Sequence, residues 1–64
     1  MEIFWRQNQH TKEITVLTQE QLFEEIPLLL KSNPDLAWPR DVLKQLLGGV
    51  CLRATQYTYY GERV

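Results

Sequence analysis

The amphipathic segment in the middle of the chain constrains the fold most strongly, because it joins a helix start signal to helical periodicity. Thr18 and Gln21 have the spacing of a capping box, in which each side chain binds the backbone N–H of the other residue. The apolar residues that follow lie on one helical face: Leu22, Phe23, Ile26, Leu29 and Leu30. Pro27 removes a backbone donor, so we expect a kink or a break near Glu25–Ile26, and the unchanged apolar phase favours the kink.

A second helix and three strands are predicted from the rest of the chain. Pro39 suits the first position of a helix, Arg40–Leu47 has one apolar face, and Gly48 suits the end of that helix. The polar segment Gln7–Lys12 can close a hairpin between the first two strands. Segments rich in β-branched and aromatic residues favour the strands: Glu2–Arg6, Glu13–Leu17 and Val50–Tyr60.

The predicted order is therefore ββααβ, in a single small α+β domain that spans residues 1–64. The economical architecture is a three-stranded, mostly antiparallel sheet with both helices packed on one face. The last strand can pair with either of the first two, and a three-layer arrangement through a dimeric sheet is also open. We expect residues 61–64 to form a frayed tail.

Composition limits how so short a chain is stabilised. The chain has 64 residues, and a core of this size seldom supplies more than about 3–5 kcal/mol. One cysteine cannot form an internal disulfide, and one cysteine with one histidine cannot complete a structural zinc site. We therefore expect no metal and no cofactor. Association with another protein, or with a second copy as a homodimer, is the remaining means of stabilisation.

The charge and hydropathy of the chain give no general attraction to nucleic acid or to membranes. The net charge of −1 supplies no bulk attraction to nucleic acid or to an anionic membrane. No apolar run is long enough to cross a bilayer, and the N-terminus lacks the order of a signal peptide. Because the charge is near zero and no apolar run is long enough, we expect no membrane contact. Because the chain has a single cysteine, we expect a cytoplasmic location. These properties would suit a small accessory protein of bacteria or phages.

The last predicted strand supplies the candidate site. Strict alternation places one set of its residues toward the helices: Val50, Leu52 and Ala54. The other set is then expected on an open sheet face: Cys51, Arg53, Thr55, Tyr57 and Tyr59. Tyrosine and arginine are enriched where proteins bind. We therefore predict a partner-binding face whose contact residues are Tyr57, Tyr59 and Arg53, with Trp5 or Phe4 beside them according to register.

Two alternatives place these tyrosines elsewhere. A β-bulge near Gln56 would return Tyr57 and Tyr59 to the core. The rings could also do no more than cover their cross-strand neighbours.

Other residues suggest other functions. The same face, with Arg6 and Phe4, could stack bases and contact phosphates of single-stranded nucleic acid, although the chain has no basic cluster. Glu20 and Glu24 are i, i+4 neighbours and form a secondary acidic patch, which either lies in solvent or receives a basic partner. Nothing in the sequence pairs the single histidine or cysteine with a catalytic neighbour, so we expect no enzyme activity. The leading prediction is a non-enzymatic protein-binding module: a small regulator, inhibitor or adaptor.

Overall fold

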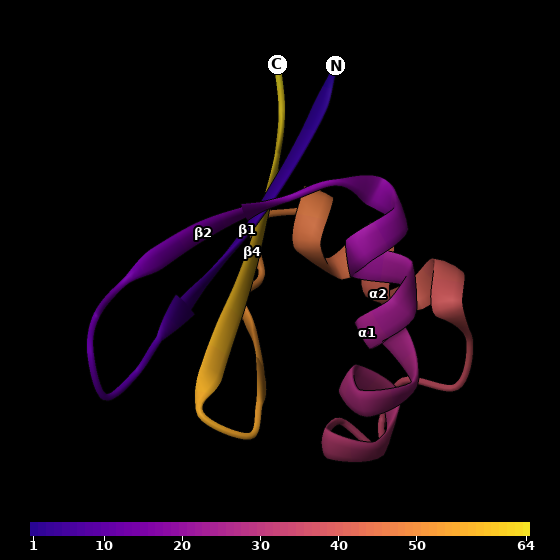
Figure 1. Cartoon of the computed structure of the whole chain (residues 1–64). Helices are drawn as coiled ribbons and strands as arrows, with labels where there is room; N and C mark the ends of the chain where they lie inside the picture. Colours follow the sequence, from indigo (N-terminus) through magenta and orange to yellow (C-terminus); the bar gives the residue numbers. More distant parts are fainter.

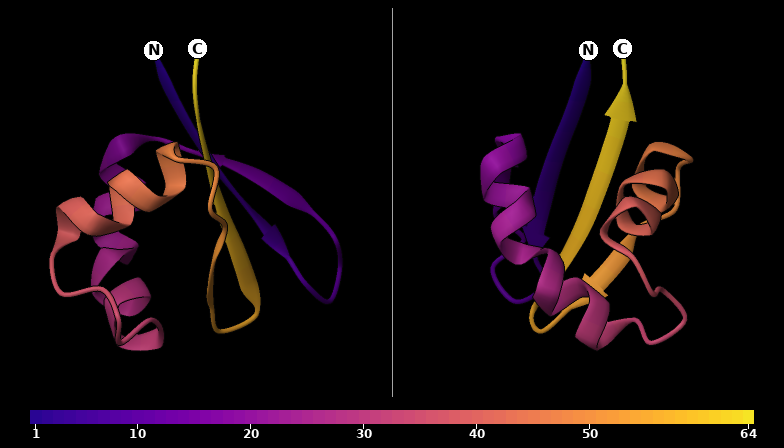
Figure 2. Two further views of the ribbon diagram at one scale, coloured as in Figure 1. Left: turned by 180° about the vertical axis from the view of Figure 1, so that it is seen from behind. Right: turned by 90° about the vertical axis from the view of Figure 1, so that its right-hand side faces the viewer.

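Six elements of secondary structure follow one another in the order ββααββ. The structure is a computed structural model that describes residues 1–64. The elements are β1 (Glu2–Asn8), β2 (Ile14–Leu17), α1 (Gln19–Ser32), α2 (Pro39–Leu47), β3 (Leu52–Ala54) and β4 (Tyr57–Arg63). The four strands form one antiparallel sheet with the order β2-β1-β4-β3. Both helices pack on the same side of this sheet, so the fold has two layers (Figures 1 and 2).

The predicted α+β class is confirmed, but the predicted third strand is in fact a hairpin of two strands. Residues Thr55 and Gln56 form a two-residue turn, and the flanking residues Ala54 and Tyr57 pair across it. Thr55 has a φ of 55°, a conformation that is unusual for a β-branched residue. Its hydroxyl donates to the carbonyl of Ala54 at 2.6 Å. The turn escaped prediction because Thr-Gln lacks the Asn-Gly or Gly-X signature of a two-residue hairpin.

The strand that follows this turn is longer than the sequence suggests. β4 continues to Arg63 and pairs with β1 along its whole length, from Asn8↔Tyr57 to Glu2↔Arg63. Residues 61–63 are therefore part of the sheet, and the expected frayed tail is wrong for them. The pairing of the first and last strands also brings the two ends of the chain together (Figure 1).

The first helix begins as predicted and is not divided by its proline. Thr18 and Gln21 form the capping box, because the Gln21 backbone N–H donates to the Thr18 hydroxyl at 3.1 Å and the Thr18 N–H donates to the Gln21 side chain at 2.9 Å. α1 continues through Pro27 to Ser32. Pro27 is exposed, so water can reach the Phe23 carbonyl that loses its donor. The apolar phase is therefore kept across the proline.

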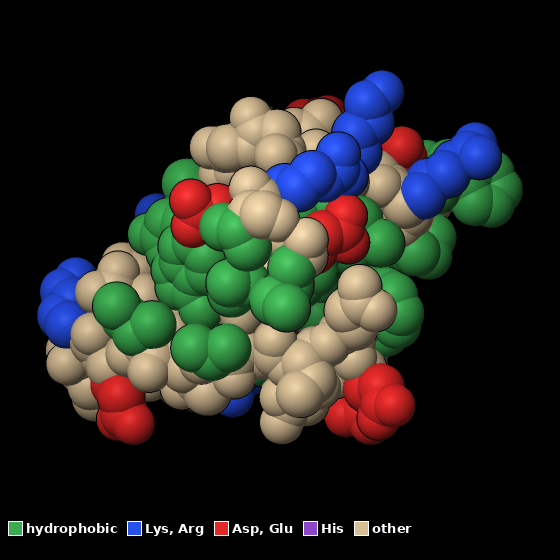
Figure 3. All heavy atoms as spheres, turned by 90° about the horizontal axis from the view of Figure 1, so that it is seen from above, with side chains coloured by type: hydrophobic (Ala, Val, Ile, Leu, Met, Phe, Trp, Pro, Cys, Tyr) green, Lys and Arg blue, Asp and Glu red, His purple; other side chains and the backbone are tan.

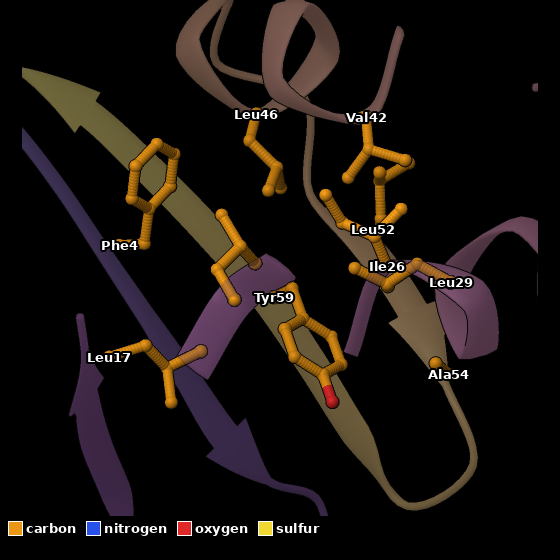
Figure 4. Close-up of a cluster of buried hydrophobic side chains, with 10 residues drawn as sticks. Phe4, Leu17, Ile26, Leu29, Val42, Leu46, Leu52, Ala54 and Tyr59 are labelled. Atoms are coloured by element: carbon orange, nitrogen blue, oxygen red, sulfur yellow. The ribbon is translucent and has the colours of Figure 1, made fainter. Parts of the chain in front are cut away.

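The core lies between the two helices and the covered face of the sheet (Figure 4). Its ten buried residues come from every element: Phe4, Leu17, Leu22, Ile26, Leu29, Val42, Leu46, Leu52, Ala54 and Tyr59. Burying one such leucine or phenylalanine contributes about 1.5–3 kcal/mol. The core therefore depends on a few large side chains, and most of the remaining residues reach solvent.

Gly61 allows α2 to approach the sheet closely. It lies in β4 opposite Phe4. A Cβ at this position would lie 3.0 Å from the Leu46 Cβ and 3.1 Å from the Phe4 ring. A glycine inside a strand often marks such a close approach. A residue with a Cβ does not fit here, because α2 and the Phe4 ring occupy the space that the Cβ would need.

Candidate interaction surface

Strand register assigns every strand residue to one of two sheet faces. Residues opposite each other in an antiparallel pair share a face, and Phe4, Gly61 and Leu17 are opposite one another across β4, β1 and β2. These residues define the covered face, beneath the helices. The alternate positions of the same strands define the open face, which no helix covers. Its residues are Ile14, Val16, Ile3, Trp5, Gln7, Thr58, Tyr60, Glu62 and Arg53.

The open face has an apolar centre. Trp5 and Tyr60 are opposite one another on β1 and β4, and their rings stack with centroids 5.6 Å apart and planes 11° from parallel. Val16 is opposite Trp5 on β2. Val16 is 69% exposed and its neighbour Ile14 is 60% exposed. Four large apolar or aromatic side chains thus share one uncovered surface, and such surfaces often bind other proteins.

The margin of the open face is polar and nearly neutral. The Gln9 side chain donates a hydrogen bond to the hydroxyl of Thr58, which is buried. Arg53 and Glu62, one basic and one acidic, are the charged residues of this face. Hydrophobic side chains also gather on the end of the molecule at which both termini lie (Figure 3). An apolar centre with a polar margin is the general anatomy of a protein-binding surface.

The structure separates the predicted contact residues into two groups. Trp5 and Arg53 lie on the open face, as predicted. Tyr59 lies on the covered face and is 0% exposed, so its predicted exposure is wrong. Of the alternatives Trp5 and Phe4, the register places Trp5 on the open face, and Phe4 is buried at 1% exposure. Tyr57 also lies on the covered face, partly buried, with its ring edge-on to that of Tyr59.

The two-residue turn explains this reversal. Cross-strand partners share a face, and in this hairpin Ala54 is the partner of Tyr57, three residues later. The inward-facing positions therefore change from even to odd numbers at the turn. The β-bulge considered as an alternative gave the right result for the tyrosines, although the structural cause is a turn.

Arg6 lies at the margin of the covered face and is already engaged. Its guanidinium forms an ion pair with Glu25 of α1 and lies 4.3 Å from the centre of the Tyr57 ring. Burial acts to lower the pKa of Arg6, but the neighbouring Tyr59 and the Glu25 charge raise it above its usual value. Burial, together with the Glu25 charge, also raises the pKa of the Tyr59 hydroxyl. Arg6 is therefore a structural cation that joins the sheet to α1.

The predicted acidic patch borders a cavity beside β2. Glu24 lines this cavity of about 210 Å³ together with Thr15 of β2 and with Arg6, Leu17, Gln21 and Glu25. Glu20 lies one turn before Glu24 on α1. Both glutamates are exposed, and neither takes part in an ion pair. The acidic patch therefore flanks the edge strand of the sheet, a position that the sequence did not indicate.

The two residues with the most reactive side chains lie outside the strands. His10 is exposed in the β1–β2 hairpin loop, where its backbone N–H donates to the Asn8 side chain at 2.8 Å. Cys51 is exposed immediately before β3 as a free thiol. No group of three or more His, Cys, Asp or Glu side chains is placed to hold a metal ion. No helix has the length and apolar character needed to cross a bilayer.

Three residues of the apolar centre are not among the predicted contact residues: Ile14, Val16 and Tyr60. The alternation of β2 already places Ile14 and Val16 on one side of the strand. Which side that is depends on where the helices pack, and Tyr60 could be placed only with the turn at Thr55 and Gln56 known. No protein-family model, curated protein or solved structure matches this chain.

Proposed function

We propose that this protein is a non-enzymatic protein-binding module, a small regulator, inhibitor or adaptor that acts by occupying a partner's surface. The observation that carries the proposal is the uncovered apolar centre of the open face: Ile14, Val16, Trp5 and Tyr60. A partner surface that covers these side chains would remove apolar area from water, which is the main favourable term in protein association. Trp5 and Tyr60 also match the residue types that dominate binding energy at interfaces.

The geometry favours a protein partner over single-stranded nucleic acid on the same face. Base stacking needs exposed ring faces, but Trp5 and Tyr60 stack on each other and so cover one face of each ring. Phosphate binding needs free cations, but Arg6 lies on the covered face and is paired with Glu25. Arg53 is balanced on the open face by Glu62. These features support apolar contact and give little support to a stacking platform.

The proposal is tested by capture of partners from lysate of the native host, with the tagged chain as bait. We compare the wild type with a double variant of the open face, Trp5→Ala with Tyr60→Ala. The matched control is Phe23→Ala with Trp38→Ala, because these two aromatic side chains are also exposed, at 49% and 60%, but belong to the helical layer. We expect a stoichiometric protein that survives nuclease, is lost with the open-face variant and is retained with the control.

Two results would contradict the proposal. Capture that disappears after nuclease treatment would favour nucleic acid as the partner. Capture that depends on Phe23 and Trp38 but not on Trp5 and Tyr60 would place the binding surface on the helical layer. Far-UV circular dichroism of both double variants checks that each retains the fold.

A further inference from the structure

The β2 edge of the sheet has unpaired backbone groups. The Asn8 N–H donates to the Glu13 carbonyl at 2.9 Å, so the carbonyl of Glu13 points toward β1. Backbone direction alternates along a strand, so Thr15 and Leu17 also point toward β1, whereas Ile14 and Val16 point away from it. β2 is an outer strand. The N–H and C=O groups of Ile14 and Val16 are therefore free to pair with an added strand.

This edge is short, but it lacks three other features by which proteins commonly protect an edge: a charged residue, a proline and a covering segment. Charged residues, prolines and covering segments commonly block edge pairing. β2 reads Ile-Thr-Val-Leu, and its first three residues are exposed. The β1–β2 hairpin also projects away from both helices (Figures 1 and 2). β2 thus offers a short, uncharged, accessible edge.

The two sides of this edge differ in chemistry. On the open face, Ile14 and Val16 present apolar side chains. On the helix side, Thr15 shares its cavity with Glu24, and Glu20 lies one helical turn away. Because opposite residues of paired strands share a face, an added strand would place alternate side chains beside the apolar pair and beside the two acids.

We propose that the β2 edge binds an extended polypeptide segment of a partner protein in which basic and apolar residues alternate. The backbone of the segment pairs with Ile14 and Val16, its apolar side chains pack beside theirs, and its lysine or arginine side chains lie beside Glu20 and Glu24. Main-chain pairing supplies affinity in this mode of recognition, and the alternating side chains supply specificity. The inference rests on the proposed function only in assuming a protein partner.

Charge favours this segment over a second copy of β2. In the antiparallel register that uses all four free backbone groups, Ile14 of each copy is opposite Val16 of the other. Glu13 precedes β2 and shares the helix side with Thr15 by alternation. A second copy would therefore bring its own Glu13 toward an edge that already carries Glu20 and Glu24. A basic segment replaces this repulsion with attraction.

The test is a titration followed by fluorescence anisotropy at low salt. The probe is a labelled, end-capped peptide of about eight residues that alternates lysine and valine, with a glutamate–valine peptide as the charge control. We expect saturable binding of the lysine–valine peptide that weakens as salt rises, and no binding of the control peptide. Absence of binding, or equal binding of both peptides, would overturn the inference.

Two variants locate the binding. Val16→Pro removes an outward-pointing N–H without removing a ladder hydrogen bond, and we expect about tenfold weaker binding, the value of one hydrogen bond. Glu20→Gln with Glu24→Gln should weaken binding by about two- to fivefold. The matched control is Asp35→Asn, a change of one charge at an exposed site away from the open face and β2. It is compared with Glu24→Gln alone and should leave binding unchanged. Binding that is insensitive to the first two variants would overturn the inference.

The inference and the proposed function can fail separately. If the peptide does not bind while a captured protein still depends on Trp5 and Tyr60, only the edge inference fails. If the peptide binds but capture is independent of those two residues, only the open-face proposal fails. Analytical ultracentrifugation of the free chain tests the second copy: a dimer that Val16→Pro dissociates would assign the edge to self-association and overturn the inference.

Discussion

Tyr59 and Tyr60 are neighbours in the chain and have the same side chain, yet the fold gives them opposite roles. Tyr59 lies beneath the helices and is fully buried. Tyr60 lies on the open face, partly exposed and stacked on Trp5. Both helices pack on the covered face, whereas no element of this chain packs on the open face. The contrast teaches that residue type alone does not assign a function here, because position relative to the helices decides whether an aromatic ring supports the core or can meet a partner.

Exchanging one tyrosine at a time for alanine gives the largest expected difference between the two faces. Tyr59→Ala should cost about 3–5 kcal/mol, because it leaves a cavity in the core. A loss of this size approaches the whole stability expected of so small a core. Tyr60→Ala should cost about 1 kcal/mol, mainly from the lost stacking on Trp5. Urea unfolding of both variants measures the difference, and equal costs would mean that the open face also supports the core.

Proline substitution at adjacent β2 positions tests the same alternation in the backbone. Thr15→Pro removes an N–H that pairs with β1, and we expect a loss of roughly 3 kcal/mol. Val16→Pro removes an N–H that points to the free edge, and the loss should be about 1 kcal/mol or less. The midpoints of thermal unfolding report the two losses. The reverse order would show that the edge assignment in β2 is wrong.

Gly61 offers a way to disturb the covered face from within the sheet. Gly61→Ala puts a methyl group about 3 Å from Leu46 and Phe4; such overpacking typically costs about 1–3 kcal/mol. Chemical denaturation compares this variant with the wild type. A Gly61→Ala protein as stable as the wild type would contradict the close approach of α2 to β4.

High pH gives the smallest expected effect, which acts through Tyr59 on the covered face. An unfolded tyrosine has a pKa of about 10, and burial with the Glu25 charge raises the pKa of Tyr59 in the folded protein. The contribution of Tyr59 is therefore intact below pH of about 10 and is lost as pH rises through the folded pKa. Unfolding free energies at pH of about 8 and 11 should show a smaller decline in Tyr59→Phe than in Tyr60→Phe. An identical decline would contradict this assignment.

Much of the covered layer could be predicted from the sequence, because it depends on local signals. The capping box at Thr18, the proline at the start of α2 and the periodicity of α1 each report a physical requirement of the helix itself. The hairpin between the first two strands is likewise marked by a polar segment between apolar runs. The number of strands was not predictable in the same way, since the turn at Thr55 has no typical turn residue.

The candidate site was harder to predict because it depends on register and layer packing. Arg53 lies on the open face as predicted, but Tyr59 is buried. The sequence leaves Trp5 and Phe4 as alternatives, and the register decides for Trp5. A shift of one position in a strand moves every side chain to the other face, so one missed turn reversed the assignment of two tyrosines, Tyr57 and Tyr59. The position of Glu24 beside Thr15 depends on how α1 crosses the sheet, which no local pattern encodes.

The most direct test maps the residues of this protein to which an extended peptide binds. We would record amide spectra and hydrogen exchange of the isotope-labelled chain, free and with the alternating lysine–valine peptide. We expect shifts and slowed exchange at Ile14 and Val16, with little change on β3, where the Asn33 side chain already donates to the Arg53 carbonyl at 3.0 Å. Shifts confined to β3 or to the covered face, with Ile14 and Val16 unchanged, would contradict the claim that the β2 edge binds an extended segment of a partner.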